Sequence, residues 1–250
     1  MRWNDDLLSP GPDPLWSQIA QRLRASITAG EFRPGEALPS EAAINAAFKV
    51  SRTTARASLD RLRQEGLIIR QSGRGSIVLK PKVEQPVTQL ASFAKDMRQR
   101  GLKAGYATFG AGFADITAEA AEALNLAPGF KAFQIRRLLL GDDEPMAMSE
   151  SWLAPSVLGA SAGPTSVELD SGSLYAWLAA RCDVRIAGAR QLIEAAIADP
   201  MMARRLGVDA GSPVLVARRR SNAADGSPIE YAVMHYRADR YRFSVNLAGI

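Results

Sequence analysis

The chain is poor in the residues that build metal and covalent sites. Its 250 residues include one cysteine, Cys182, and one histidine, His235. A lone cysteine allows no intramolecular disulfide, which is typical of a protein of the reducing cytoplasm. One cysteine and one histidine are too few for a zinc site with nitrogen and sulfur ligands. We therefore expect neither a metal nor another cofactor.

Long apolar runs are also absent. No uninterrupted apolar stretch approaches the ~20 residues that span a bilayer. The N-terminal sequence MRWNDDLLSPGP is acidic and lacks the apolar core of a secretory signal. Apolar content is nevertheless 47%, enough for ordinary globular cores, and the length suits one large domain or two small ones. The sequence predicts a cytoplasmic protein that does not use a membrane.

Sequence motifs of catalysis are missing. The chain contains no nucleophile elbow, no phosphate-binding glycine loop and no cluster of metal-ligating residues. These absences argue against an enzyme. Acid–base chemistry by Glu230 or Glu150 together with Tyr236 is the enzymatic alternative that the residues leave open.

Positive charge is concentrated in the first third of the chain. The net formal charge is +5, and residues 1–82 carry all of it, because basic and acidic residues are equal in number in the remainder. Residues 49–82 hold nine basic and two acidic residues, a net charge of +7. Such an excess attracts a polyanion such as DNA through counterion release. A solvated basic surface is the alternative, but it does not explain why the excess coincides with the pattern described next.

The basic region reads as helix, turn, helix and hairpin. Four-residue spacing of apolar residues predicts a helix over residues 14–29. Ser40 can cap a second helix over residues 41–48, and Ser51 can cap a third that runs to Glu65. The runs LIIR and SIVL then predict two short strands joined by QSGRG, whose glycines permit a tight, exposed tip.

The third helix of such a unit lays its N-terminal residues in the major groove of DNA. Arg52 and Arg56 are four residues apart and so share one helix face, and an arginine can grip guanine with two hydrogen bonds. Arg74, at the hairpin tip, can enter the minor groove or lie along phosphate. The predicted DNA-binding residues are Ser51, Arg52, Thr53, Thr54, Arg56, Gly73 and Arg74.

These residues belong to a wider resemblance. The segments PLWSQIAQRLRASITAGEFRPGEALPSE, VSRTTARASLDRLRQEGLI and GRGSIV resemble the GntR family over about residues 14–79. The resemblance implies a winged helix-turn-helix with Arg52, Thr53, Thr54, Arg56 and Gly73 at DNA-contacting positions. One departure is Ala42, where the family usually has an arginine after P-S-E, so a phosphate contact is expected to be missing.

The pattern changes beyond KPKVEQPV, a segment with two prolines that is typical of a linker. We predict a DNA-binding domain over residues 10–80, a linker over 81–87 and an effector-binding domain over 88–248. Strands interspersed with short helices make the second domain α+β. Strands are expected at residues 104–112, 132–140, 185–196, 213–221, 229–236 and 242–246, and helices at 88–100, 117–124, 173–180 and 200–206.

Residues 86–248 resemble the ligand-binding UTRA domain of the HutC-type branch of that family. The matching segments are GFKAFQIRRLLLGDDEPMAMSESWL, SGSLYAWL, ARRLGVDAGSP and GSPVLVARRRSNAADGSPIEYAVMHYRADRYRF. The resemblance implies a chorismate-lyase-like fold, an antiparallel sheet with flanking helices and an effector pocket beside it. Carried over by position, Arg137, Ser173, Glu230 and Tyr236 line that pocket.

The chemistry of these four residues suits an acidic effector. Glu230 and Tyr236 share parity along a strand and so point to one face, whereas His235 points away. An arginine fork such as that of Arg137 pairs with a carboxylate or phosphate, and Ser173 can hold an anion at a helix N-terminus. The structural alternatives are a helix cap for Ser173, a core position for Tyr236 and an exposed strand position for Arg137.

Two further features bear on the effector. Phosphosugar-sensing relatives often show R-x-R where this chain has Arg137-Leu138-Leu139, so Leu139 removes a positive group and favours a monocarboxylate or zwitterion. The run Arg218–Arg220 is predicted to be a solvated or interface feature, because alternate strand residues face opposite sides.

Together these features predict a cytoplasmic transcriptional repressor, a homodimer on a palindromic double-stranded DNA operator. A small metabolite with a carboxylate or phosphate group is expected to release it. The alternatives are a histidine-utilisation repressor that senses urocanate, a DNA-tethered enzyme that uses the chorismate-lyase-like domain, and an architectural DNA-binding protein with a degenerate sensor.

Overall fold

The computed structural model describes residues 3–4, 8, 11–71, 73–87, 92–159 and 161–247. The chain divides into two compact units, Met1–Pro81 and Lys82–Ile250, and each has a buried core of its own. No helix within the described ranges is long and apolar enough to cross a membrane.

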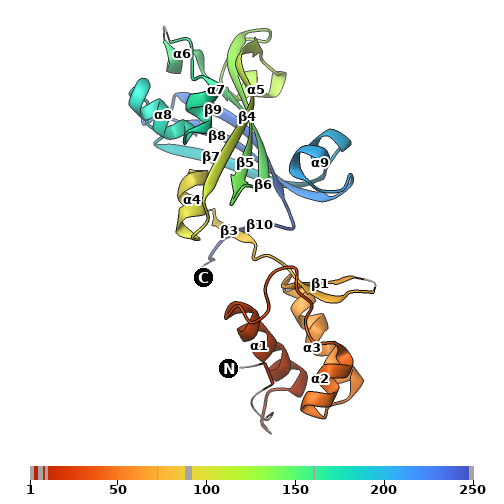
Figure 1. Cartoon of the computed structure of the whole chain (residues 1–250). Coiled ribbons are helices and arrows are strands. Elements are labelled where there is room, and N and C mark those ends of the chain that lie inside the picture. The colour runs from red at the N-terminus through yellow and green to blue at the C-terminus, as the bar shows by residue number, and fades with distance from the viewer. Residues whose placement is uncertain are drawn as a thin grey trace. The chain divides into compact units, whose positions relative to one another are not determined.

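The first unit is a helical body with a two-stranded hairpin (Figure 1). Its described elements are α1 (Leu15–Thr28), α2 (Glu41–Phe48), α3 (Arg52–Gln64), β1 (Ile68–Gln71) and β2 (Gly75–Val78). Ser40 and Ser51 cap α2 and α3 as predicted, since their hydroxyls accept hydrogen bonds from the N–H groups of Ala43 and Thr54. The helix and strand predictions for this unit are confirmed, with shifts of one or two residues at the ends.

The helices of the first unit meet over one apolar core. Ile19 and Leu23 of α1, Ile44 of α2 and Leu62 of α3 are fully buried, each stabilising the fold by roughly 1.5–3 kcal/mol. The ends of α1 and α3 are also joined by a two-pronged ion pair, in which Arg24 donates to both carboxylate oxygens of Glu65 at 2.7 and 2.9 Å. These contacts fix the orientation of α3.

The second unit is built on a sheet with strand order β4–β5–β6–β9–β8–β7, in which all neighbours are antiparallel (Figure 1). The strands, in chain order, are β4 (Ala104–Asp115), β5 (Lys131–Gly141), β6 (Glu144–Leu153), β7 (Gly188–Ile197), β8 (Pro213–Asn222) and β9 (Pro228–Arg237). The helices are α4 (Phe93–Gln99), α5 (Ala118–Ala123), α6 (Pro155–Leu158), α7 (Ser166–Asp170), α8 (Leu174–Arg181) and α9 (Pro200–Leu206). The predicted antiparallel sheet with flanking helices is confirmed.

A second, two-stranded sheet in this unit changes the linker prediction. Residues 83–86, expected within a linker, form strand β3 (Val83–Pro86), which pairs in parallel with β10 (Tyr241–Ser244). The reason is burial: Val83 and Tyr241 are both buried in one apolar cluster, and this offsets the entropy of ordering the segment. The helix expected from residue 88 begins at Phe93, with Ser92 as its cap, and residues 88–91 lie outside the described ranges.

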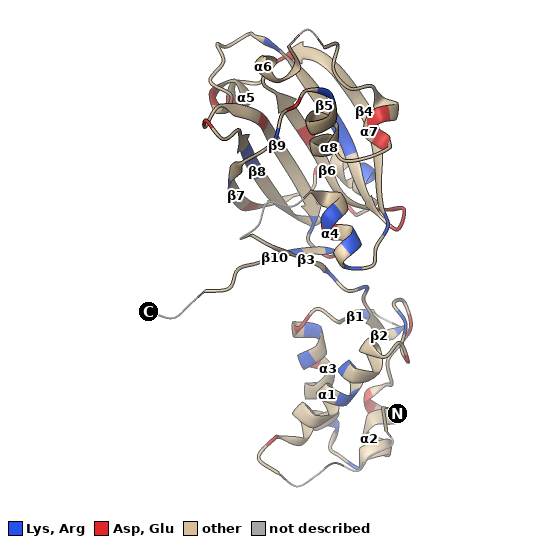
Figure 2. Ribbon diagram, turned by 90° about the vertical axis from the view of Figure 1, so that its left-hand side faces the viewer, with Lys and Arg blue, Asp and Glu red and all other residues tan. Residues whose placement is uncertain are grey.

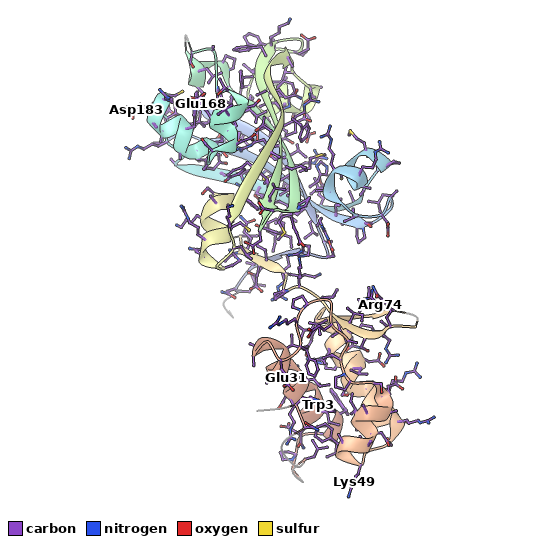
Figure 3. All side chains as sticks on the ribbon, viewed as in Figure 1. Trp3, Glu31, Lys49, Arg74, Glu168 and Asp183 are labelled. Carbon is purple, nitrogen blue, oxygen red and sulfur yellow. The ribbon has the colours of Figure 1, made fainter. Side chains whose placement is uncertain are left out.

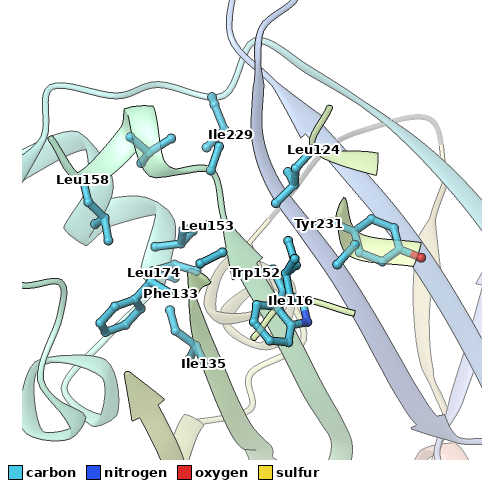
Figure 4. Close-up of a cluster of buried hydrophobic side chains, with 14 of the residues drawn as sticks. Ile116, Leu124, Phe133, Ile135, Trp152, Leu153, Leu158, Leu174, Ile229 and Tyr231 are labelled. Atoms are coloured by element: carbon cyan, nitrogen blue, oxygen red, sulfur yellow. The ribbon is translucent and has the colours of Figure 1, made fainter. Parts of the chain in front are cut away.

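The largest apolar core of the second unit gathers side chains from strands and from α8 (Figure 4). Phe133 and Ile135 of β5, Leu153 of β6 and Leu174 of α8 are all buried in it. Leu174 is the first residue of α8, so the core fixes the start of that helix. Cys182 follows the last residue of α8 and packs against the same cluster from a partly exposed position.

Candidate DNA-reading surface and effector cavity

The exposed face of α3 carries the residues predicted to read DNA. Arg52, Thr53 and Arg56 are exposed, whereas Ala55 and Leu59 on the opposite face are buried in the core of the first unit. The core therefore turns the cationic face of the helix outward.

Two predicted DNA contacts also have a structural role. The Ser51 hydroxyl accepts the Thr54 N–H at 3.1 Å and lies 2.9 Å from the Thr54 hydroxyl. Ser51 is therefore the helix cap, and its position at the start of α3 also places it beside the exposed cations.

The hairpin tip presents a cation on a glycine-built turn. Gly73 and Gly75 have φ values of 75° and 84°, which lie in the left-handed region that glycine adopts without strain. Arg74 between them is exposed. Figure 3 shows the labelled Arg74 and Lys49 projecting from the ribbon of the first unit.

The basic residues of α3 and the hairpin fall into two groups. Blue segments mark Lys and Arg along α3 in Figure 2. Ion pairs occupy one group, namely Arg61–Glu65, Arg63–Asp60 and Arg70–Glu41. Arg52, Arg56 and Arg74 have no ion-pair partner within the part of the chain that the structure describes. The predicted DNA contacts therefore coincide with the cations left available to an external anion.

A cavity in the second unit is lined by all four predicted effector residues: Arg137 of β5, Ser173 before α8, and Glu230 and Tyr236 of β9. Its volume is about 60 Å³, room for on the order of four water molecules.

Arg137 is the least satisfied charge in this cavity. It is 6% exposed, and Nη1 donates long hydrogen bonds of 3.3 and 3.5 Å to the carbonyls of Leu169 and Gly172. Its Nε has no hydrogen-bond partner among the described residues. Burial lowers the pKa of Arg137. Glu230 and Asp170 act on this charge but form no ion pair with it within the described residues. A buried guanidinium without such a pair is costly, so Arg137 is suited to an incoming anion.

Glu230 is a buried hydrogen-bond acceptor in the same cavity. It is 3% exposed and accepts a hydrogen bond from the Tyr175 hydroxyl at 2.9 Å, which lies 3.2 Å from the Ser221 hydroxyl. Burial, followed by the negative charge of Glu230, raises the pKa of Tyr175 well above its ordinary value. Tyr175 therefore remains a donor, and Glu230 retains acceptor sites for a hydroxyl or amine of a ligand.

Two charged residues of the cavity escaped the sequence analysis. Arg219 and Asp96 both line it and are buried. Arg219 lies at the middle of the run predicted to be a solvated or interface feature, and that prediction was wrong for this member, because Arg219 is buried. Strand alternation turns Arg219 inward, where Nε donates to the Gln191 side chain at 2.7 Å, while Arg218 pairs with Glu119 and Glu194 on the other side. Alternation along β8 separates Arg219 from its two neighbours, but it does not say which side of the strand faces the cavity.

The sequence left open whether Ser173 is only a helix cap and whether Tyr236 is only a core residue. Ser173 precedes α8, but its side chain makes no cap hydrogen bond, so the hydroxyl is available to the cavity. Tyr236 lines the cavity and is also a core residue, since its ring stacks on Tyr241 with 4.2 Å between centroids. The Tyr236 hydroxyl donates to the weakly accepting sulfur of Met234 at 3.2 Å, and burial raises its pKa to about 12.

The two glutamates of the enzymatic alternative are placed differently, because Glu230 lines the cavity together with Tyr236 and Glu150 does not. Glu150 accepts hydrogen bonds from the side chains of Gln134 and Trp152 and is absent from the cavity lining, whereas its strand neighbours Ser149 and Ser151 are part of it. His235 also lies outside the lining. Glu150 and Tyr236 therefore cannot act together as an acid–base pair.

Comparison with known protein families gives one match in each of the two units of the chain. The family model "UTRA domain" matches residues 99–242, and the model "Bacterial regulatory proteins, gntR family" matches residues 15–78. The chain belongs to the GntR family of regulators with a UTRA domain. It is therefore a DNA-binding transcriptional regulator, and regulators of this family bind operators and respond to small-molecule effectors.

Individual GntR relatives cover nearly the whole chain. The HTH-type transcriptional repressor NagR of Bacillus subtilis (strain 168) is 35% identical over 93% of this chain and 94% of its own length. The mannosyl-D-glycerate transport/metabolism system repressor MngR of Escherichia coli (strain K12) is 27% identical over 94% of this chain and 96% of its own. The crystal structure of PhnF from Mycobacterium smegmatis superposes with a TM-score of 0.67 at 26% identity, covering 92% of this chain and 99% of PhnF.

Proposed function

We propose that this regulator is a cytoplasmic, homodimeric repressor that leaves a palindromic operator when a small anionic metabolite enters the cavity of its second unit. Arg137 carries the proposal, because the Nε of this buried guanidinium has no hydrogen-bond partner and no carboxylate of the described residues forms an ion pair with it. An anionic group on the ligand supplies that partner with charge-assisted hydrogen bonds.

The other charges narrow the ligand class. Arg219 gives the cavity a second cation, so the position of Leu139 does not leave Arg137 as the single positive group. A carboxylate and a phosphate are thus both compatible with the arginines. Glu230 and Asp96 favour a ligand that also carries hydroxyl or amine donors. We therefore infer a hydroxylated or aminated acid, and the name of the relative MngR refers to mannosyl-D-glycerate, an acid with several hydroxyls.

The DNA-binding half of the proposal rests on α3 and the hairpin. Arg52 and Arg56 are exposed and unpaired among the described residues, and a helix of this kind reads base edges with its first turns. Two copies reading related half-sites give an operator with two-fold symmetry. Neither the urocanate alternative nor the enzymatic alternative gains support from the relatives.

One experiment tests both ligand binding and the release of DNA. Purified protein is screened by thermal shift against sugar acids, sugar phosphates, amino sugars, amino acids and urocanate. A ligand at 100 times its Kd stabilises by about 2.7 kcal/mol, roughly 5–10 °C at this size. Each hit is then added to the protein bound to a labelled DNA fragment from upstream of its own gene. We expect a stabilising acid to raise the Kd for DNA at least tenfold, and a stabilising ligand that leaves DNA affinity unchanged would overturn the proposal.

A further inference from the structure

A second cavity lies on the face of the six-stranded sheet that is turned away from the effector cavity. It is formed by α5 and by strands β7, β8 and β9, and its volume is about 430 Å³. Arg219 lines the effector cavity and Arg220 lines this one, because successive residues of a strand point to opposite faces. We call this second space the α5 cavity.

The α5 cavity holds two like charges side by side. Arg190 of β7 lies directly opposite Arg220 of β8 in the antiparallel ladder, and both line the cavity. Like charges in directly opposite positions destabilise a sheet. Neither guanidinium forms an ion pair with a described residue. An anion placed between the two arginines would relieve this repulsion.

Two polar atoms of the same cavity also lack hydrogen-bond partners. Arg220 Nε and Asn222 Oδ1 are shielded from solvent and have no partner among the described residues, and both residues line the cavity. On β7 the position opposite Asn222 is Gly188, which has no side chain to fill the space. A buried donor and a buried acceptor that stay unpaired are costly. A ligand that carries both an acceptor oxygen and a hydroxyl group can satisfy the two.

The acidic residues of the cavity leave its positive charge in excess. Glu119 accepts hydrogen bonds from Arg218 at 2.7 and 2.9 Å and another from the Tyr231 hydroxyl. Arg218 also donates to Glu194 at 2.9 Å, so its charge is compensated. Glu122 is exposed, lines the cavity and forms no ion pair within the described ranges. One carboxylate thus stands against two arginines that lack ion pairs.

We propose that the α5 cavity is a second anion site, which binds a phosphate group between Arg190 and Arg220. The tetrahedral group has enough oxygens to accept charge-assisted hydrogen bonds from both guanidinium groups. When it carries one proton, its hydroxyl donates to Asn222 Oδ1. The volume leaves room for the organic part of a phosphate monoester beside the phosphate itself. The site goes beyond the proposed function and does not depend on what binds in the effector cavity.

Calorimetric titration with inorganic phosphate tests the site. The full chain carries R137Q, which removes the proposed anion partner in the effector cavity, so that binding reports on the α5 cavity. We expect saturable binding of one phosphate per chain. Adding R220Q or R190Q should raise the Kd at least about tenfold, because each removes a charge-assisted hydrogen bond. R185Q, at an exposed arginine outside the cavity lining, is the matched control and should leave the Kd unchanged.

Arg190 is exposed, so R190Q keeps the measurement valid if R220Q fails to fold. No saturable binding, or binding that survives in both R190Q and R220Q, would overturn the site. Equal weakening in R185Q would also overturn it, because it would show a general effect of surface charge. The thermal-shift screen of the wild type tests the effector cavity separately, so either proposal can fail alone.

Two further comparisons identify the ligand chemistry. Sulfate has no proton to donate at neutral pH, so we expect it to bind more weakly than phosphate, and N222A should abolish this difference. A preference for phosphate that N222A leaves unchanged would overturn the role of Asn222. E122Q should tighten binding, since it removes the remaining carboxylate. Tighter binding of glycerol 3-phosphate than of inorganic phosphate would identify the ligand as a monoester, and the reverse order would identify it as the free ion.

Discussion

The guanidinium of Arg137 lies over the ring of Tyr106, with 4.8 Å between the guanidinium carbon and the ring centroid. The two residues come from the adjacent strands β5 and β4. The electron-rich ring face partly offsets the buried positive charge, but a ring accepts no strong hydrogen bond from Nε. The contact holds the guanidinium in place while leaving hydrogen-bonding capacity for a ligand.

Replacing this arginine separates binding from folding. We expect R137Q to abolish the thermal shift given by the acidic effector, because the charged partner is lost. We also expect the free energy of unfolding without ligand to change little, because the relief of a costly buried charge is set against the loss of its contacts with Tyr106 and with the carbonyls of Leu169 and Gly172. Thermal shift and urea unfolding measure the two effects.

The control for this variant is R136Q, at the neighbouring exposed position that stacks on Phe109 instead. It should retain the full ligand response. A ligand shift that survives in R137Q, or one that is lost equally in R136Q, would remove Arg137 from the effector site.

Substitutions of Arg52 and Arg74 should affect DNA binding in different ways. R52A should cost about 1–3 kcal/mol in discrimination between operator and altered operator. R74A should weaken binding to all sequences and lower the salt slope of log K by about one if Arg74 lies along phosphate. Fluorescence anisotropy at several salt concentrations distinguishes the two. R63A, whose guanidinium is paired with Asp60, serves as the control and should change neither quantity by more than twofold.

Ser51 allows the cap and the DNA contact to be told apart. S51A removes the acceptor for the Thr54 N–H and should cost about 0.5–2 kcal/mol of stability in the first unit. S51D keeps a capping oxygen and should retain the wild-type melting temperature. Its negative charge should nevertheless weaken DNA binding through repulsion of phosphate. If S51D binds DNA as tightly as the wild type, Ser51 lies away from the backbone of the operator.

Asp96 should make stability depend on pH. Burial raises the pKa of this carboxyl above its ordinary value, against the opposing effect of Arg100. The folded state therefore binds the proton more tightly than the unfolded state, so the free energy of unfolding falls as pH rises through the pKa of the folded form. D96N removes this dependence. We expect the variant to gain stability over the wild type as pH rises from below the ordinary pKa of a carboxyl toward neutrality, as measured by urea unfolding.

The exposed residue Asp209 provides the comparison for that series. D209N should track the wild type at every pH. A D96N variant that is equally destabilised at both ends of the range would show that the Asp96 carboxylate makes a contact more valuable than its burial is costly.

Local signals predicted the first unit well because short-range chemistry specifies it. Ser40 and Ser51 cap their helices within the next three residues, and Gly73 and Gly75 supply the conformations of the hairpin tip. The elements that the sequence did not predict depend on distant partners. Strand β6 mixes Ser149 and Ser151 among apolar residues, and those serines become intelligible only when they face a polar cavity.

The same distinction applies to the cavity. The family resemblance implied Glu230 and Tyr236 in advance, and strand parity agreed with it, because both lie on β9. The contribution of Arg219 required the pairing of β8 with β9, which no local pattern encodes. Asp96 comes from α4, a helix whose packing against the cavity depends on the whole unit.

Cys182 is the single thiol of this chain and lies at the C-terminal end of α8. It terminates α8, the helix whose first residue follows Ser173 at the cavity wall, and burial raises the pKa of its thiol. A maleimide dye therefore reacts at one position, faster at mildly alkaline pH. Fluorescence from that label offers a direct optical readout of α8 during titration with candidate metabolites, with no engineered cysteine needed.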